Sequence, residues 1–148
     1  MRLSVIGCGY LGAVHAVSMA RLGHDVVGID VDTARIGDLT AGRAPFFEPR
    51  LPELLAEGLE SGRLKFSNDL ADAAGAGVHF ICVGTPQRKG EYAADMRYVD
   101  AAVAGLAPYL SPGNIVAGKS TVPVGTAARL ADQLAEAAPE AILAWNPE

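Results

Sequence analysis

The sequence has few cysteines, no basic run and no long apolar stretch, and each shortage excludes a class of protein. Two cysteines among 148 residues do not make the disulfide framework of a small secreted domain, and neither has a Cys-x-x-Cys or metal-ligand spacing. A net charge of −5 without a basic run argues against nucleic acid as a partner. No apolar run is long enough for a transmembrane helix, so we expect no membrane span. From the cysteine spacing we expect no metal site.

The length and composition that remain are those of one ordinary globular domain. Half of the residues are hydrophobic and a fifth are charged, which is enough to bury a core of its own. Arg2 and the apolar stretch up to Ala20 superficially resemble a secretory signal peptide. Three glycines and a histidine interrupt that stretch, however, and its removal would delete the first strand of a βαβ unit. We therefore expect a cytoplasmic protein with reduced, inert thiols.

The beginning of the chain organises the rest, because the apolar run 3–6 leads directly into the pattern Gly-x-Gly-x-x-Gly. In a dinucleotide-binding turn, Gly7 would make the tight turn after the strand and Gly9 would let the backbone approach a pyrophosphate. Gly12 would let the following helix pack closely on the strand. The positive end of that helix would then face the phosphates. The pattern predicts a dinucleotide site.

An acidic residue stands where the ribose partner of such a site is expected. The apolar run 26–29 ends at Asp30, about twenty positions after the turn. Its carboxylate can accept hydrogen bonds from ribose hydroxyls and would repel a 2′-phosphate, which favours NAD over NADP. Arg35 works against this preference, since a guanidinium can hold a phosphate. Asp30 could also cap the helix that follows it.

Alternating strand and helix patterns continue to the end of the chain. The segment 78–83 is nearly all apolar, as in a central parallel strand, and His79 within it is interpreted as a hydrogen-bonded structural residue. Ser67 or Asn68 could cap a brief helix through residue 73. This order predicts an α/β fold, a Rossmann-type doubly wound parallel sheet of six strands with helices on both faces. The predicted strands are 2–6, 25–29, 64–66, 78–83, 115–117 and 142–144, and the main helices are 10–22, 32–39, 51–60, 96–109 and 126–137.

Residues 113–120 are a literal match to Gly-x-x-x-x-Gly-Lys-Ser, the phosphate-binding loop of ATPases and GTPases. In that loop a helix opens at the lysine, and the intervening residues are not a strand. Here residues 115–117 have the character of the strand itself, and Pro123 follows too soon for an unbroken helix from Lys119. We interpret the match as a strand and a turn.

Longer motifs give a specific resemblance over essentially the whole chain. They are GCGYLG at 7–12, ID at 29–30 with Arg35, FEP at 47–49, VGTP at 83–86, GEYAADMRYV at 90–99, KSTVPVGT at 119–126 and NPE at 146–148. The chain resembles the N-terminal domain of the UDP-glucose/GDP-mannose dehydrogenase family. The resemblance implies oxidation of a nucleotide sugar from alcohol to carboxylate with two NAD. UDP-glucose is the favoured substrate, with GDP-mannose and UDP-N-acetylmannosamine as alternatives.

The resemblance also implies roles for single residues of a site that carries no metal. Thr121 would position a water near the reacting carbon, and Glu148 matches a glutamate implicated in acid–base chemistry, for which burial would raise the pKa suitably. The implied cofactor contacts are Gly7, Gly9, Tyr10, Leu11 and Gly12 at the pyrophosphate, Asp30 and Arg35 at the adenosine end, and Val83, Gly84, Thr85, Pro86, Ser120 and Thr121 along the rest of NAD.

The sequence departs from the family in two respects. The family continues beyond Glu148 into a second domain that carries the catalytic cysteine, and neither Cys8 nor Cys82 matches that cysteine. We therefore expect residues 1–148 to be an NAD-binding fragment that is inactive alone, from a full-length parent that forms homodimers. Gly84 stands where family members more often have proline or asparagine. A stand-alone NAD-binding module remains the alternative.

Overall fold

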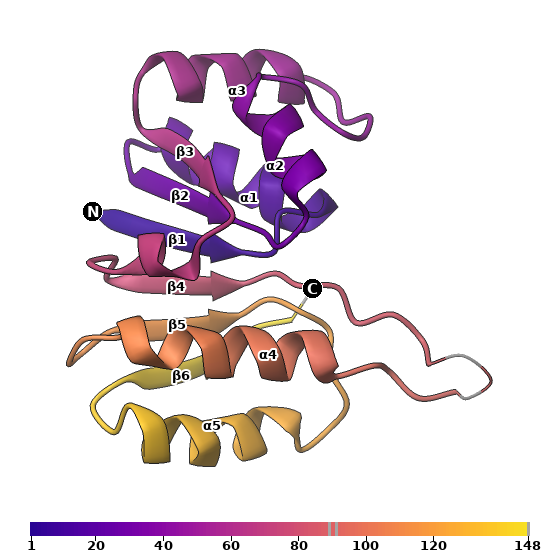
Figure 1. Cartoon of the computed structure of the whole chain (residues 1–148), viewed down its shortest axis with the longest axis vertical. Coiled ribbons are helices and arrows are strands. Elements are labelled where there is room, and N and C mark those ends of the chain that lie inside the picture. The colour runs from indigo at the N-terminus through magenta and orange to yellow at the C-terminus, as the bar shows by residue number, and fades with distance from the viewer. Residues whose placement is uncertain (89, 91, 148) are drawn as a thin grey trace.

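A computed structural model of the chain describes residues 1–88, 90 and 92–147. Within these residues, six strands form one sheet in the order β3-β2-β1-β4-β5-β6 (Figure 1). Each strand is parallel to its neighbours, so the predicted doubly wound parallel sheet is confirmed. The strands are β1 (Arg2–Ile6), β2 (Asp25–Ile29), β3 (Leu64–Ser67), β4 (Val78–Ile81), β5 (Ile115–Gly118) and β6 (Ile142–Trp145).

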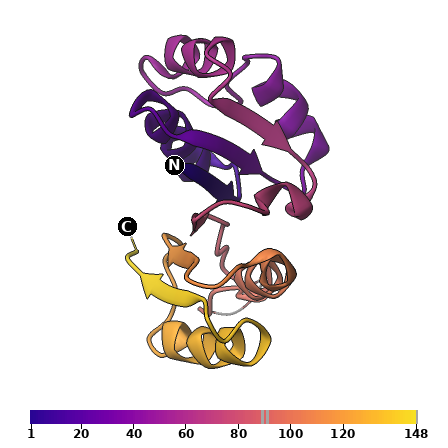
Figure 2. The ribbon, with the colours of Figure 1, turned by 90° about the vertical axis from the view of Figure 1, so that its left-hand side faces the viewer.

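Helices cover both faces of the sheet, as predicted. Figure 1 shows α4 in front of the sheet and α1 behind it, and Figure 2 shows α3 at the β3 end and α5 at the β6 end. The helices are α1 (Tyr10–Arg21), α2 (Thr33–Thr40), α3 (Leu51–Glu60), α4 (Arg97–Leu106) and α5 (Thr126–Ala137), with short 3₁₀ helices η1 (Leu70–Ala73) and η2 (Ala107–Tyr109).

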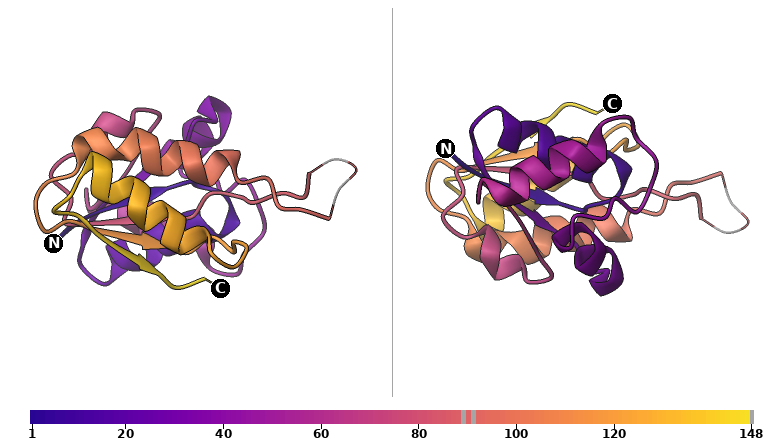
Figure 3. Two further views of the ribbon diagram at one scale, coloured as in Figure 1. Left: turned by 90° about the horizontal axis from the view of Figure 1, so that it is seen from below. Right: turned by 90° about the horizontal axis from the view of Figure 1, so that it is seen from above.

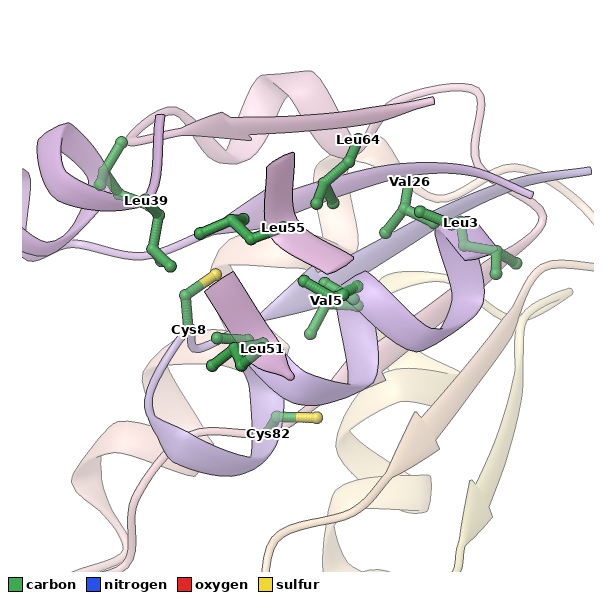
Figure 4. Packing of buried hydrophobic residues seen from close by; sticks show 14 residues of the cluster. Leu3, Val5, Cys8, Val26, Leu39, Leu51, Leu55, Leu64 and Cys82 are labelled. Carbon is green, nitrogen blue, oxygen red and sulfur yellow. The ribbon is translucent and has the colours of Figure 1, made fainter. Parts of the chain in front are cut away.

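Two hydrophobic cores lie on opposite faces of the sheet. On the face of α1 and α3, Leu3 and Val5 of β1 pack with Leu51 and Leu55 of α3 (Figure 4). On the face of α4 and α5, the buried side chains include Ile6 of the same strand β1. Successive side chains of a strand point to opposite faces. A strand covered on both faces is therefore mostly apolar, which is why the central strands show little alternation.

Two predicted details of the helices were wrong. The predicted helix 96–109 divides, because Pro108 has no N–H group and the chain tightens into η2 after Leu106. The brief helix η1 is capped by Asp69, which accepts the N–H of Ala71 at 2.8 Å, and not by Ser67 or Asn68. The side chain of Asn68 donates instead to the backbone carbonyl of Asp30, also at 2.8 Å.

His79 is a buried structural residue, as the sequence predicts. On β4, its Nδ1 lies 2.8 Å from the Ser4 hydroxyl of β1, and its Nε2 lies 3.2 Å from Oδ1 of Asn114. That oxygen also accepts the N–H of Ser111, so it is the acceptor and Nε2 carries the hydrogen. Nδ1 then accepts the Ser4 hydroxyl, and a neutral imidazole satisfies both contacts. Burial lowers the pKa of His79 below its ordinary value.

This lowered pKa predicts a loss of stability in mild acid. Below the ordinary histidine pKa of about 6.5, the unfolded chain binds a proton at position 79 that the folded chain does not. The free energy of unfolding should then decrease as the pH is lowered, by up to about 1.4 kcal/mol per pH unit from this one group. In urea titrations between pH 7 and 5, the His79→Gln variant should show a shallower pH dependence than the native chain. Equal slopes would contradict this assignment.

Candidate functional site

The glycine-rich turn after β1 has the tight geometry that its sequence predicts. Gly7 has φ +92°, and a Cβ at this position would lie 2.8 Å from the Cα of Val83. Its N–H donates to the carbonyl of Ile29 at 2.7 Å. A Cβ at Gly12 would lie only 1.8 Å from the carbonyl oxygen of Gly7. The first turn of α1 therefore rests directly on the backbone of the turn.

Gly9 is different, because space lies open beside it. A Cβ at Gly9 would meet no atom within 4 Å, and the residue caps α1 without a side-chain hydrogen bond. The amides at the start of a helix have no intrahelical acceptor, and the helix dipole favours an anion there. The side chain of Leu11 packs toward the core of α1 and α3, so its backbone is the part suited to a phosphate.

The carboxylate of Asp30 is already held in place by three donors. Oδ2 accepts the N–H of Cys8 at 2.7 Å and Nη1 of Arg35 at 2.9 Å, and Oδ1 accepts the N–H of Asp32 at 2.9 Å. A carboxylate has about four acceptor positions, so one remains for a ribose hydroxyl. The bond from Cys8 also joins the tip of β2 to the glycine-rich turn.

Arg35 is tied to two carboxylates. It pairs with Asp30 at 2.9 Å and with Asp32 at 3.5 Å. A 2′-phosphate would have to compete with both carboxylates for this guanidinium, which strengthens the argument for NAD over NADP. Asp32 is the residue that caps α2, accepting the N–H of Arg35 at 3.0 Å. The alternative in which Asp30 caps that helix is therefore wrong.

A contact that the sequence did not reveal lies beside the turn. The hydroxyl of Tyr10 donates to the carboxylate of Glu48, and its ring lies against Phe46 with centroids 5.1 Å apart. The loop before α3 thus reaches the beginning of α1. The FEP motif at 47–49 contains Glu48, so it is the sequence signal that could have suggested this contact. On sequence alone the motif supports only the family resemblance.

The loops after β4 and β5 are joined by side-chain hydrogen bonds. Ser120 Oγ donates to the carbonyl of Val83 at 2.7 Å, and Thr85 Oγ1 donates to the carbonyl of Thr121 at 2.8 Å. Because β4 lies between β1 and β5, these loops continue the edge formed by the glycine-rich turn and Asp30. The structure thus brings the predicted cofactor residues to one edge of the sheet. Glu148 lies outside the described residues.

Beyond Gly84 the chain leaves the sheet as an arm, defined here by the described residues 86–88, 90 and 92–95 and seen most clearly in Figure 3. At its base, the N–H of Asp95 donates to the carbonyl of Pro86 at 2.7 Å. The Asp95 carboxylate also accepts the N–H of Arg97, the first residue of α4, at 3.1 Å, and its hydrogen bonds from Arg97 lower its pKa to about 2. The exposed Gly84 and Pro86 therefore lie where the edge meets the arm.

Other candidate chemistry is absent from the described part of the chain. Burial, followed by the nearby charge of Asp30, raises the pKa of Cys8 far above its ordinary value, which keeps this thiol protonated. Within the described residues, no three histidine, cysteine or acidic side chains could hold a metal ion, and no helix could cross a membrane. Residues 115–118 of the apparent P-loop form β5, and the next helix begins at Thr126, so that match is a strand and a turn.

Comparison with known proteins gives one family. The profile of the "UDP-glucose/GDP-mannose dehydrogenase family, NAD binding domain" matches residues 1–148. UDP-glucose 6-dehydrogenase of Rhizobium meliloti is 44% identical over 151 residues, covering 100% of this chain and 35% of that protein. GDP-mannose 6-dehydrogenase of Pseudomonas syringae is 46% identical over 90 residues, covering 60% of this chain and 20% of that protein.

Solved structures agree with the sequence relatives. The UDP-D-ManNAc dehydrogenase of Pyrococcus horikoshii superposes with a TM-score of 0.94 at 33% identity, covering 100% of this chain and 36% of that one. This chain therefore spans about a third of the length of the proteins it matches. With a full-length profile match and a shared Rossmann-like fold, the chain belongs to the UDP-glucose/GDP-mannose dehydrogenase family, in which it corresponds to the NAD-binding domain.

Proposed function

We propose that this chain binds NAD along the carboxyl edge of its sheet and serves as the cofactor-binding part of a UDP-glucose 6-dehydrogenase. The observation that carries the proposal is the hydrogen bond from the Cys8 N–H to Asp30 at 2.7 Å. It fixes a carboxylate for the ribose beside an open helix start for the pyrophosphate. Bound NAD would accept the hydride, and the chain's own residues would bind and orient it.

The proposed contacts follow the edge from β2 to β5. At the pyrophosphate, Gly7, Gly9, Tyr10, Leu11 and Gly12 would act through their backbone. Asp30 and Arg35 would hold the adenosine end. Val83, Gly84, Thr85, Pro86, Ser120 and Thr121 would line the remaining cofactor. Two catalytic roles are proposed as well, with Thr121 positioning a water near the reacting carbon and Glu148 acting in acid–base chemistry.

The substrate and partners are proposed from the relatives. UDP-glucose is favoured because four curated relatives at 40–44% identity over 84–100% of this chain are UDP-glucose 6-dehydrogenases. GDP-mannose and UDP-N-acetylmannosamine are the alternatives. We propose that the residues that read the sugar, and the catalytic cysteine, lie outside residues 1–148 of a homodimeric parent. The buried thiols of Cys8 and Cys82, neither of which is in a disulfide, fit a reducing cytoplasm.

Calorimetry on the 148-residue chain tests the proposal directly. NADH should bind with a dissociation constant below about 1 mM, whereas ATP with magnesium should give no binding heat. The chain should produce no NADH from NAD and UDP-glucose, because the cysteine and the sugar site are not among these residues. A folded chain that does not bind NADH would contradict the NAD site. NADH formation by this chain would contradict the proposal that the catalytic cysteine and the sugar site lie outside these residues.

A further inference from the structure

Trp145 is the single tryptophan of the chain, and it occupies the end of β6 opposite Gly118 of β5. A Cβ at Gly118 would lie 2.2–2.4 Å from three atoms of the indole ring. The face of the indole therefore covers the backbone of β5 where that strand ends. No other amino acid at position 118 leaves room for the ring in this position, so the glycine and the tryptophan form a matched pair.

The indole also holds the loop that follows β5. Its Nε1–H donates to the carbonyl of Ser120 at 3.0 Å. That carbonyl belongs to the peptide bond between Ser120 and Thr121, so the hydrogen bond fixes the orientation of this peptide. The indole nitrogen can donate a hydrogen bond but not accept one, and the Ser120 carbonyl is its acceptor.

From the other side, the same loop is held by the segment after β4. The Ser120 hydroxyl donates to the carbonyl of Val83 at 2.7 Å, and the Thr85 hydroxyl donates to the carbonyl of Thr121 at 2.8 Å. The Ser120 hydroxyl also lies 3.3 Å from the carbonyl of Ile81. Side chains of three residues thus orient this turn, and two of them, Ser120 and Thr85, are proposed to line NAD. The third, Trp145, has no such role.

We infer that Trp145 is a positioning residue for the half of NAD that lies beyond the pyrophosphate, an inference that rests on the proposed function. The indole N–H keeps the Ser120–Thr121 peptide in the orientation that the cofactor meets. Without this donor the Ser120 carbonyl loses its hydrogen bond from Trp145, and NAD must orient the peptide on binding, which weakens affinity. The adenosine half is held at β1 and β2, so its binding is independent of Trp145.

Replacement of one atom tests the inference. Because Trp145 is the only tryptophan, expression in a tryptophan auxotroph supplied with 3-benzothienylalanine changes this position alone. The analogue keeps the bicyclic shape and puts sulfur where the N–H was. The dissociation constant for NADH should rise about three- to tenfold, as expected for one hydrogen bond. Affinity for ADP, which ends at the pyrophosphate, should stay at the value of the normal chain, and the thermal midpoint should fall by no more than about 4 °C.

The indole proton gives a second measurement on the normal chain. Its single ¹⁵N–¹H resonance should shift when NADH is added and stay in place when ADP is added. Equal NADH affinity in the two chains would overturn the inference while leaving the NAD site intact. Equal weakening of NADH and ADP would also overturn it, since that is the result of a general structural role. If the normal chain bound neither ligand, the proposed function itself would fail, and the inference with it.

Discussion

A chain with alanine at position 12 is expected to lose the native fold or at least about 4 kcal/mol of its free energy of unfolding. The added Cβ of Gly12→Ala would lie 1.8 Å from the Gly7 carbonyl oxygen, which is a backbone atom. Gly7 cannot move aside, because its N–H is bonded to Ile29 at 2.7 Å and its Cα faces the backbone of Val83. The start of α1 must lift from the sheet. Thermal and urea unfolding would measure the loss.

Gly9→Ala is the matched control within the same turn. Gly9 has φ −67°, which alanine adopts without strain, and its Cβ would meet no atom within 4 Å. Stability should stay within about 1 kcal/mol of the native chain, while NADH affinity should fall about tenfold or more, because the methyl group takes space meant for the pyrophosphate. A stable Gly12→Ala chain would refute the packing argument, and normal NADH binding by Gly9→Ala would refute the phosphate position.

Asp30→Asn is expected to damage both the fold and the site. Each carboxylate oxygen of Asp30 accepts at least one N–H group, from Asp32 on one side and from Cys8 and Arg35 on the other. The amide nitrogen of asparagine would face one of these donors with hydrogens of its own, at a cost of about 1–3 kcal/mol of stability. Loss of the acceptor for the ribose should weaken NADH about 10- to 100-fold. Calorimetry and urea unfolding measure the two effects separately.

Asp25→Asn is the control for this prediction, because Asp25 begins the same strand at its opposite end. Its carboxylate is exposed and lies 3.5 Å from Arg63, a surface pair of little energetic weight, so neither stability nor NADH affinity should change appreciably. For the native chain, NADPH should bind at least about a hundredfold more weakly than NADH, since its extra phosphate would meet Asp30 and Asp32. Comparable affinity for the two cofactors would contradict the interpretation of Asp30 and Arg35.

The sheet and the turn could be predicted from the sequence because their causes are local. The apolar runs of the central strands follow from cover on both faces, and the roles of Gly7 and Gly12 follow from spacing alone. The residues of the site could also be placed on one edge, because parallel strands bring their carboxyl ends together. Their roles toward NAD and the sugar remain predictions, and Glu148 lies beyond the described residues.

The contacts that the sequence did not reveal join residues far apart in the chain. Tyr10 meets Glu48, and Trp145 donates to Ser120, across 38 and 25 positions. Neither pair follows from periodicity, which reports burial but not the partner. The wrong caps have a different cause. At the starts of η1 and α2, several neighbouring side chains could accept the same backbone N–H group. The position where the preceding strand ends decides that Asp69 and Asp32 are the acceptors.

The burial of the Cys8 and Cys82 thiols has a practical consequence. Both side chains are buried and neither is in a disulfide, and a maleimide or iodoacetamide reagent reacts with accessible thiolates. A single new cysteine placed on the surface would therefore be the only rapidly labelled position, with no need to remove the native pair. Spin labels or dyes attached at a described residue of the arm can follow it as cofactor is added, in the otherwise unaltered chain.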